Sequence, residues 1–431
     1  MNTKFTLTNE GLYQWAKDIF PIYRCLTGKG VRTTLEYIKN IVPSLIIHSV
    51  ESGKKVFDWE IPKEWEVTEA YIEDESGNKI IDIKDNNLHV VGYSHSIDQW
   101  VSLDELQNHL HSLPNQPTAL PYITSYYSSN WGFCIAHEQK KLLTEQQYHV
   151  VIKSKHFDGM LNYGEILIPG KTKKEVFLST YICHPSMANN EVSGPVVATA
   201  LAKWLSSRVG NKYTYRIIFI PETIGSINYL SRNLEHLQSH VIAGFNITCV
   251  GDNNCYSFMP SRSGDTLSDR AAKHVLYYID KNYLQYSWLE DRGSDERQYC
   301  APGIDLPIAS IMRSKYGEYE EYHTSLDNLD FISADGLGGA FEALKQAIEV
   351  IELNCVPRTT VLCEPQLGKR GLYPQISTRE SGRQVKTMMN LIALSDGKND
   401  LLTIADLINV SILDIKVILE QLIKNKILEK I

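Results

Sequence analysis

The sequence predicts an α/β fold in which a mostly parallel mixed sheet carries helices on both faces, with a β-rich inserted domain and a C-terminal winged-helix domain. Three observations predict it. Strand and helix patterns alternate from about residue 166 to 353, short alternating apolar runs fill the preceding hundred residues, and the last 50 residues are strongly helical. A chain of 431 residues is long enough for two to three such domains.

The first 50 residues carry helical patterns. Trp15, Ile19 and Ile22 fall at helical spacing, and a second helix pattern covers 33–41. If these helices pack on the sheet, residues 1–50 and 166–353 form one discontinuous α/β domain, and 51–165 is inserted into it.

The sequence pattern of the inserted region is typical of β structure. Alternating apolar runs at 55–59, 70–72 and 88–91 are separated by turn residues, and aromatic side chains cluster at 126–133. We therefore expect a β-rich inserted domain over 51–165.

The α/β region alternates regularly, which favours a parallel sheet. The predicted strands are 176–182, 214–220, 242–250 and 306–312, and the predicted helices are 195–208, 223–238, 265–282 and 334–353.

A boundary at Pro357 separates the C-terminal region. Helix patterns at 384–395, 403–409 and 412–425, followed by a short strand at 427–431, are typical of a winged helix over 357–431. Thr403 is expected to be the N-cap of the middle helix.

The expected recognition helix, 412–425, has charges that nearly cancel. It carries Asp414, Lys416, Glu420 and Lys424 and no arginine, whereas DNA binding needs cationic contacts to phosphate. We therefore expect a role in packing or in dimerisation, the second of which implies a homodimer, and no nucleic-acid partner.

Composition narrows the class of partner further. The net charge of −8 argues against binding to nucleic acid or acidic membranes, and no apolar run approaches the length of a membrane span. The N-terminal residues show no apolar signal core, and the eight cysteines form no CxxC pair. We expect a cytoplasmic protein with reduced thiols and no membrane partner.

The loop after the strand at 176–182 is the first candidate site. It carries His184, Asn190 and Glu191 just before a helix begins near residue 193. Ligands bind at the carboxyl ends of strands in open α/β sheets, so these residues predict a metal or active site.

Three further loops carry candidate residues. Glu222 follows the next strand, where the alternative is an acidic residue favoured by the helix dipole. Asp295 lies in a Gly-Ser-Asp loop, and His323 lies in an acidic loop with Asp327 four residues later as a carboxylate that could orient it. The alternative for His323 is a solvated surface histidine.

The order of these loops resembles the zinc aminopeptidases of the two-zinc type over roughly 166–350. A closer resemblance covers the whole chain and is to bacterial proteins with an aminopeptidase-like domain, often associated with polysaccharide biosynthesis. The motifs that carry it are residues 20–24, 27–32, 62–65, 88–94 and 183–186, together with the C-terminal winged helix.

The resemblance implies that His184 and His323 bind metal and that Glu222 is the general base. It also shows departures, because Asn190, Thr223 and Thr248 stand where the two-zinc enzymes carry metal-binding carboxylates. One zinc ion at most is therefore expected.

The expected ligands are the two histidines and an oxygen of Asn190 or Glu191, with Asp252 as a further acidic candidate.

Several residues are candidates for contact with the substrate. Asp295 could bind a substrate amine or support the metal ligands. Tyr322, with Tyr299 and Tyr319 as further candidates, could donate to an oxyanion; the alternative is that these tyrosines only pack, because the chain has 24 of them. Arg24, beside Arg32, could bind a substrate carboxylate or instead tie the N-terminal segment to the sheet.

The predicted function is hydrolysis of a peptide or amide bond in a small molecule or short peptide, by a zinc-activated water with Glu222 as general base. The first alternative is a degenerate aminopeptidase fold that serves as a binding or scaffolding protein. The second is a winged-helix regulator with a ligand-sensing domain.

Overall fold

The computed structural model describes residues 7–372 and 379–431, so the first six residues of the predicted 1–50 segment lie outside it. The chain divides into two compact units. One contains the residues up to Gly264 and Leu284–Phe341, and the other contains Asp265–Tyr283 and Glu342–Ile431. The predicted division into three domains stays a prediction.

The first unit is built around an eight-stranded mixed sheet in the order β1-β10-β12-β11-β13-β16-β14-β15. The four inner strands β12, β11, β13 and β16 are parallel, and β1, β10 and β14 pair with their inner neighbours in antiparallel fashion. The bounds are β1 Ile46–Glu51, β10 Met160–Ile168, β12 Thr214–Ile220, β11 Glu175–Tyr181, β13 Val241–Asn246, β16 Ile308–Met312, β14 Ser257–Met259 and β15 Leu284–Gln285.

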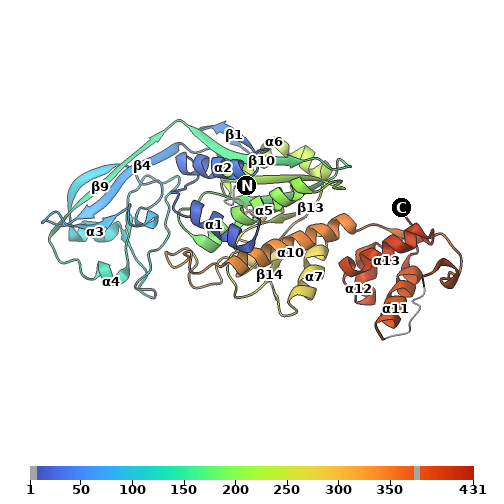
Figure 1. Ribbon diagram of the computed structural model, residues 1–431. Coiled ribbons are helices and arrows are strands. Elements are labelled where there is room, and N and C mark those ends of the chain that lie inside the picture. Colours follow the sequence, from blue (N-terminus) through green and yellow to red (C-terminus); the bar gives the residue numbers. More distant parts are fainter. Residues whose placement is uncertain (1–6, 373–378) are drawn as a thin grey trace. The chain divides into compact units, whose positions relative to one another are not determined.

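Helices cover both faces of this sheet, as predicted. Helix α5 (Ser193–Ser207) joins β11 to β12, and α6 (Ile224–His240) joins β12 to β13. Because β12 and β13 flank β11 on opposite sides, the two crossovers run in opposite directions, and right-handed crossovers place their helices on opposite faces. Helices α1 (Asn9–Ile19) and α2 (Lys29–Ile41) gather with α5 on one face (Figure 1).

The expectation that the first 50 residues are helical is wrong for the last residues of this segment. Residues Ile46–Glu51 form β1 and pair with β10 over six residues. The apolar residues Ile46, Ile47 and Val50 read equally well as strand, and the free edge of β10 supplies the backbone partners that decide the outcome.

The inserted region forms a separate four-stranded antiparallel sheet in the order β5-β4-β9-β6, and β4 and β9 run together as a long ribbon (Figure 1). Its strands are β5 Lys79–Asp82, β4 Glu64–Glu73, β9 Gln147–Phe157 and β6 Ile97–Ser102. The shorter elements are β2 Lys55–Val56, β3 Trp59–Glu60, β7 Leu110–His111, β8 Phe133–Cys134, α3 Leu103–Asn108 and α4 His137–Lys140.

The run at 88–91 is not the strand that its pattern indicates. Residues Asn87–His89 form a 3-10 turn, because the side chain of Asn86 accepts a hydrogen bond from the backbone of Leu88. Val90 makes only an isolated bridge to Phe133.

The second unit contains the winged helix. Helices α11 (Arg379–Leu394), α12 (Leu401–Ile408) and α13 (Ile412–Lys424) are followed by β18 (Leu428–Lys430), which pairs with β17 (Pro357–Thr359). The prediction that Thr403 caps α12 is wrong. Asp400 is the N-cap, and its carboxylate accepts a hydrogen bond of 2.8 Å from the backbone of Thr403.

The remaining elements are α7 Leu267–Ile279, α8 Trp288–Asp291, α9 Glu296–Tyr299, α10 Ala334–Leu353, the 3-10 turn η4 Gly368–Arg370 and the π-helical turn η3 Ala188–Val192. Over the described ranges, no helix has the length and apolar character needed to cross a membrane.

Candidate functional site

The candidate site lies at the point where the strand order of the main sheet reverses. The connections after β11 and β12 leave in opposite directions, and a crevice forms at such a point outside the carboxyl ends of the strands. A cavity of about 410 Å³ lies there. It is lined by Leu26, Trp59, Tyr122, Thr124, Tyr126, Tyr127, His184, Glu222, Thr223, Ile224, Arg297 and His323.

The cavity brings together three residues that the sequence singled out. His184 follows β11, Glu222 follows β12 and His323 follows β16. His184 and His323 are 139 residues apart in the sequence, and only the folding of the sheet makes the three residues neighbours.

The side chain of His184 is buried, and its ring is hydrogen-bonded to Glu191. Its Nδ1 lies 3.0 Å from Oε2 of Glu191, and its Nε2 lies 3.7 Å from Oε2 of Glu222. A carboxylate accepts hydrogen bonds, so we assign the proton to Nδ1, which leaves the lone pair of Nε2 facing the cavity. Burial, aided by the charge of Arg24, lowers the pKa of His184 to about 3, and the neutral imidazole is the form that binds metal.

His323 lies beside His184, with 5.6 Å between the two ring centres. Its ring stacks on that of Tyr322, with 3.9 Å between the ring centres. It makes a T-shaped contact with the ring of Tyr122, with 5.1 Å between the centres. Burial and the neighbouring His184 lower its pKa to about 3. The structure therefore does not place His323 as a solvated surface residue.

Glu222 lines the cavity, and its side chain is one-fifth exposed (21%). Burial, and then the charge of Asp295, raises the pKa of Glu222 to about 8. That is the direction expected for a carboxylate that takes up and passes on protons near neutral pH.

The backbone around the site adopts uncommon conformations. Thr223, Cys249 and His323 all have positive φ angles, of 62°, 51° and 55°. Such conformations cost about 1–3 kcal/mol each for residues other than glycine, and they concentrate at functional sites. At Thr223 the conformation is held by a 2.8 Å hydrogen bond from its backbone N–H to Asp295.

Asn190 does not line the cavity. It lies in the π-helical turn η3, and its Nδ2 donates to the hydroxyl of Tyr181 at 2.9 Å. The same hydroxyl lies 2.6 Å from Oγ1 of Thr248. Two of the positions where the two-zinc enzymes carry carboxylates are thus occupied by neutral groups bound to one tyrosine, while Oδ1 of Asn190 is buried without a hydrogen-bond partner.

Arg24 is buried behind His184 and does not line the cavity either. Its Nε donates to Oε1 of Glu191 at 3.2 Å and to the carbonyl of His184 at 3.1 Å, and Nη1 donates to the carbonyl of Ile19. This position supports the alternative in which Arg24 ties the N-terminal segment to the sheet. Arg32 pairs instead with Glu64 of the inserted region.

Asp295 and Tyr322 lie next to the cavity wall rather than on it. Asp295 is fully buried, and its Oδ1 accepts hydrogen bonds from the backbone of Thr223 and the hydroxyl of Ser226. Tyr322 contacts His323 by stacking. Both therefore support residues that do line the cavity.

The other acidic and tyrosine candidates are engaged inside the protein. Asp327 accepts from the backbone N–H groups of Asn189 and Asn190 and from the hydroxyl of Tyr319, so it fixes the turn η3 rather than orienting His323. Asp252 is bound by the side chains of Asn189 and Ser314. Tyr299 shares a hydrogen bond with Ser179.

Sequence reasoning missed Arg297 and the contribution of the inserted region. Tyr122, Tyr126 and Trp59 come from that region and line the cavity with the two histidines. The aromatic cluster at 126–133 was a signal for the inserted residues, and the closeness of Arg297 to Asp295 in sequence was a signal for Arg297.

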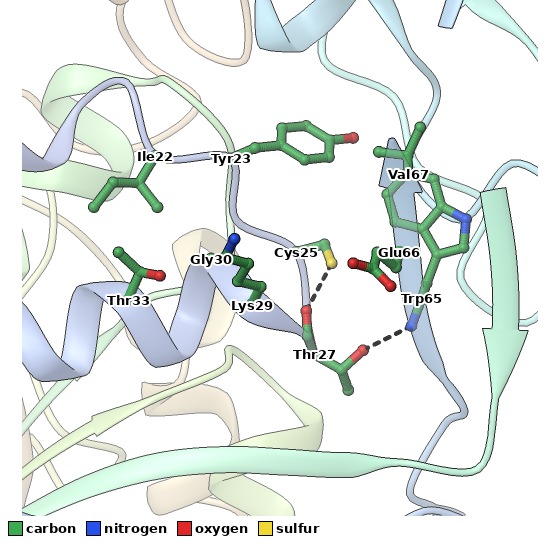
Figure 2. A pocket seen from close by; sticks show the side chains of 10 residues that line it. All are labelled: Ile22, Tyr23, Cys25, Thr27, Lys29, Gly30, Thr33, Trp65, Glu66 and Val67. Carbon is green, nitrogen blue, oxygen red and sulfur yellow. Dashed lines mark hydrogen bonds between the residues drawn. The ribbon is translucent and has the colours of Figure 1, made fainter. Parts of the chain in front are cut away.

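A second pocket, of about 250 Å³, lies between the N-terminal segment and β4. Figure 2 shows Tyr23, Cys25 and Thr27 facing Trp65, with Oγ1 of Thr27 accepting from the backbone of Trp65 at 3.4 Å. Three of the motifs that carry the whole-chain resemblance, 20–24, 27–32 and 62–65, meet here. The pocket contains none of the three cavity residues His184, Glu222 and His323, so we assign it to the attachment of the insert.

Cys183, His184 and Glu191 also offer ligand atoms within 4.8 Å of one another. This group suits a metal cation poorly, because the guanidinium of Arg24 already pairs with Glu191. Burial also holds the pKa of the Cys183 thiol well above its ordinary value. The cavity side of His184 is the better place for a metal.

Two family models match consecutive parts of the chain. A family model described as a domain of unknown function, DUF4910, matches residues 13–354, and a winged helix-turn-helix model matches residues 355–430. The chain belongs to the DUF4910 family. The winged helix predicted from the sequence is confirmed.

This DUF4910 protein is 43% identical over 407 residues to a protein from Clostridium acetobutylicum, and the match covers 92% of this chain and 91% of the relative. That relative is provisionally named a polysaccharide biosynthesis protein with an aminopeptidase-like domain. A crystal structure from the same organism, provisionally described as a peptidase, matches with a TM-score of 0.92 at 40% identity, covering 98% of this chain and 96% of that one.

The DUF4910 protein also has the fold of a zinc aminopeptidase from Bacillus subtilis. The TM-score is 0.58 at 15% identity, over 80% of this chain and 95% of the aminopeptidase. The predicted resemblance to aminopeptidase-like proteins, and the fold that it implies, are confirmed.

Proposed function

We propose that this protein is a hydrolase of a peptide or amide bond that uses one zinc ion, with Glu222 as general base. The observation that carries the proposal is the meeting of His184 Nε2, the Glu222 carboxylate and His323 in one cavity. A cavity of about 410 Å³ suits a small molecule or a short peptide.

The residues present fit one zinc ion. Two imidazoles that share a tetrahedral zinc have ring centres about 5 Å apart, and the observed 5.6 Å agrees with that. The hydrogen bond between Nδ1 of His184 and Glu191 is the support that a metal-binding imidazole usually has. We propose Asn190 as the third protein ligand. Its Oδ1 is buried without a partner, and because the residue does not line the cavity, its side chain would have to turn toward the two histidines when the metal binds.

The surroundings of Thr223 and Thr248 argue against a second zinc ion. Oγ1 of Thr223 accepts a hydrogen bond from Arg297, and Oγ1 of Thr248 is bound to Tyr181. Threonine hydroxyls so engaged do not replace the carboxylates that a second cation needs. The proposal is therefore limited to one ion.

The chemistry assigns a separate task to each group. A zinc ion held by His184 and His323 would lower the pKa of a water and polarise the amide carbonyl. Glu222 accepts the proton of the attacking water and transfers it to the leaving amine. Tyr122 and Tyr322 hold the ring of His323, and the aromatic residues of the inserted region close the cavity around the substrate.

The loss of three carboxylates favours a second candidate, a protein that kept the cavity for binding and no longer catalyses. The polar network of Asn190, Tyr181 and Thr248 supports it, because Nδ2 of Asn190 and Oγ1 of Thr248 are both bound to the hydroxyl of Tyr181 without a metal. The two candidates differ in whether Glu222 matters for turnover.

The test is Glu222→Gln in the full chain, assayed on aminoacyl and N-acyl p-nitroanilides with zinc supplied. Because a general base contributes about 100- to 10,000-fold, we expect a loss of that size with unchanged zinc content. Turnover at the wild-type rate in this variant would remove Glu222 as the base. Absence of hydrolysis by the wild type across the panel would favour the second candidate.

A further inference from the structure

Arg297 is the permanently charged cation among the side chains that line the cavity, and the proposed mechanism gives it no role beyond its hydrogen bond to Thr223 and the lowering effect of its charge on the pKa of Glu222. We propose that Arg297 binds a carboxylate of the substrate, so that the enzyme acts on amides that carry an anionic group near the scissile bond. This inference rests on the proposed function for the reaction, but its binding component can be tested separately.

Arg297 is fixed in place by neutral groups. It lies on the short helix α9, where its Nε donates to the carbonyl of Ser294 at 3.0 Å and its Nη2 donates to Oγ1 of Thr223 at 3.0 Å. In residues 7–372 and 379–431 no carboxylate lies within 4.0 Å of it, and its Nη1 makes no hydrogen bond there. The side chain is therefore oriented without being neutralised by an ion pair.

A guanidinium in this state is suited to a carboxylate. Its planar set of N–H donors matches the two oxygens of a carboxylate, and such charge-assisted pairs are about twice as strong as neutral hydrogen bonds. Two donors of Arg297 are used to hold the side chain, and the remaining N–H groups are available to the cavity. The partial burial of Arg297 limits the screening of its charge by water.

The same charge disfavours a substrate with a free amino terminus. An ammonium group needs an acidic partner, yet Glu222 is the carboxylate that lines the cavity and is assigned to the reaction. Asp295, the neighbouring acid, is fully buried below Thr223. The cavity thus has a cation where an amine-binding site would need an anion.

The place of Arg297 gives this charge a direct relation to the reacting bond. The guanidinium of Arg297 donates a hydrogen bond to Thr223, and Thr223 follows the proposed base Glu222 in the sequence. A carboxylate bound there would belong to the part of the substrate nearest the scissile amide. This geometry selects N-acyl or amide substrates with an acidic group over neutral peptides.

The kinetic test uses two matched pairs that differ in one charge. N-succinyl-alanine p-nitroanilide is compared with its methyl ester, and N-acetyl-alanyl-glycine with its glycinamide. For at least one pair we expect kcat/KM of the wild type to favour the anionic member about 10-fold or more, and Arg297→Gln to lose about 10- to 100-fold on that member alone. Arg297→Lys should recover part of the loss.

Arg292→Gln is the matched control, because Arg292 is an exposed arginine five positions earlier that does not line the cavity. It should leave the preference unchanged. An equal loss on the charged and neutral members in Arg297→Gln, with a shifted pH profile, would overturn the inference and assign Arg297 to the support of Glu222.

A binding measurement separates this inference from the proposed function. Titration calorimetry with succinate should detect binding to the wild type and to His184→Ala/His323→Ala, and binding about 10-fold or more weaker to Arg297→Gln. Equal succinate binding in Arg297→Gln, or none in the wild type, would overturn the inference. Succinate binding that depends on Arg297 in a protein that hydrolyses no amide would overturn the proposed function alone.

Discussion

Arg24 and Glu191 form an ion pair inside the protein, with exposed side-chain fractions of 1% and 0%. The same glutamate accepts the hydrogen bond of His184 Nδ1. Burial lowers the pKa of Arg24 and raises the pKa of Glu191 to about 8, so both charges are costly and each depends on the other. We interpret the pair as the support that sets the orientation of His184.

Removing one member of this pair should destabilise the protein. Glu191→Gln leaves the charge of Arg24 buried and unpaired, so we expect a loss of about 3–5 kcal/mol in the free energy of unfolding in urea. Arg24→Met should cost less, because burial raises the pKa of Glu191 and its carboxyl group becomes neutral. The double variant should lose less than the sum of the two. As a control, Glu69→Gln breaks the solvent-screened pair with Lys153 and should leave the free energy of unfolding almost unchanged. A change below about 1 kcal/mol in Glu191→Gln would contradict this role.

The sequence identified His184, Glu222 and His323 because each follows a predicted strand, and strand ends meet at one edge of a parallel sheet. It could not find Tyr122 or Arg297 in the same way. Tyr122 reaches the cavity from an insertion, and Arg297 lies on a four-residue helix that has no periodic pattern. Contacts of this kind depend on tertiary packing alone.

The helix α12 is anchored to α7 within the second unit. Asp400 caps α12 and receives two 2.8 Å hydrogen bonds from Arg270 of α7, and Asn354 also donates to it. Burial alone would raise the pKa of Asp400, but the hydrogen bonds from Arg270, Asn354 and Thr403 outweigh it and hold the pKa well below its ordinary value. This carboxylate therefore joins a segment before β15 to the winged helix.

Asp400→Asn should destabilise α12 in a pH-dependent way. A depressed pKa in the folded state means that the stability is present above about pH 4, the unfolded pKa, and is lost as the pH falls below it. At pH 7 we expect a loss of about 1–3 kcal/mol in the protection of α12 amides, measured by hydrogen exchange.

The difference from wild type should shrink toward about pH 3. The control is Glu420→Gln on the exposed face of α13, which should change protection by less than about 0.5 kcal/mol. An Asp400→Asn effect that is constant with pH would contradict the charge-based account.

Periodicity predicted most elements of the α/β region, because buried parallel strands and amphipathic helices have distinct patterns. Periodicity failed where the structure of a short segment depends on a pairing strand or on a side-chain hydrogen bond. Residues Ile46–Glu51 became a strand through pairing with β10, and the run at 88–91 became a turn through the side chain of Asn86. The sequence predicts Thr403 as the N-cap of α12, whereas the observed N-cap is Asp400, three residues earlier. Both residue types are favoured at a helix start.

The first unit as a whole makes the candidate site from two sources. The main sheet supplies His184, Glu222 and His323, while the inserted region supplies Trp59 and Tyr122. Under the proposed function, the aminopeptidase-like sheet would supply the reacting groups, and the residues of the insertion would determine which substrates fit. Substrate selection is therefore expected to differ from that of aminopeptidases without this insertion.

The charge of the chain bears on its partners. The net charge is −8, and α13 carries two acidic and two basic residues, Asp414, Glu420, Lys416 and Lys424. A recognition helix needs an excess of cations to bind phosphate. The winged helix is confirmed as a fold, and its expected role in packing or dimerisation stays a prediction.

The central claim is that His184 and His323 hold one zinc ion, and its direct test is the zinc content of protein purified without chelator. We predict about one zinc per chain, lost in His184→Ala/His323→Ala and kept in His236→Ala/His240→Ala, a stacked pair outside the cavity. The absence of zinc after zinc is supplied, or its retention in His184→Ala/His323→Ala, would contradict the account.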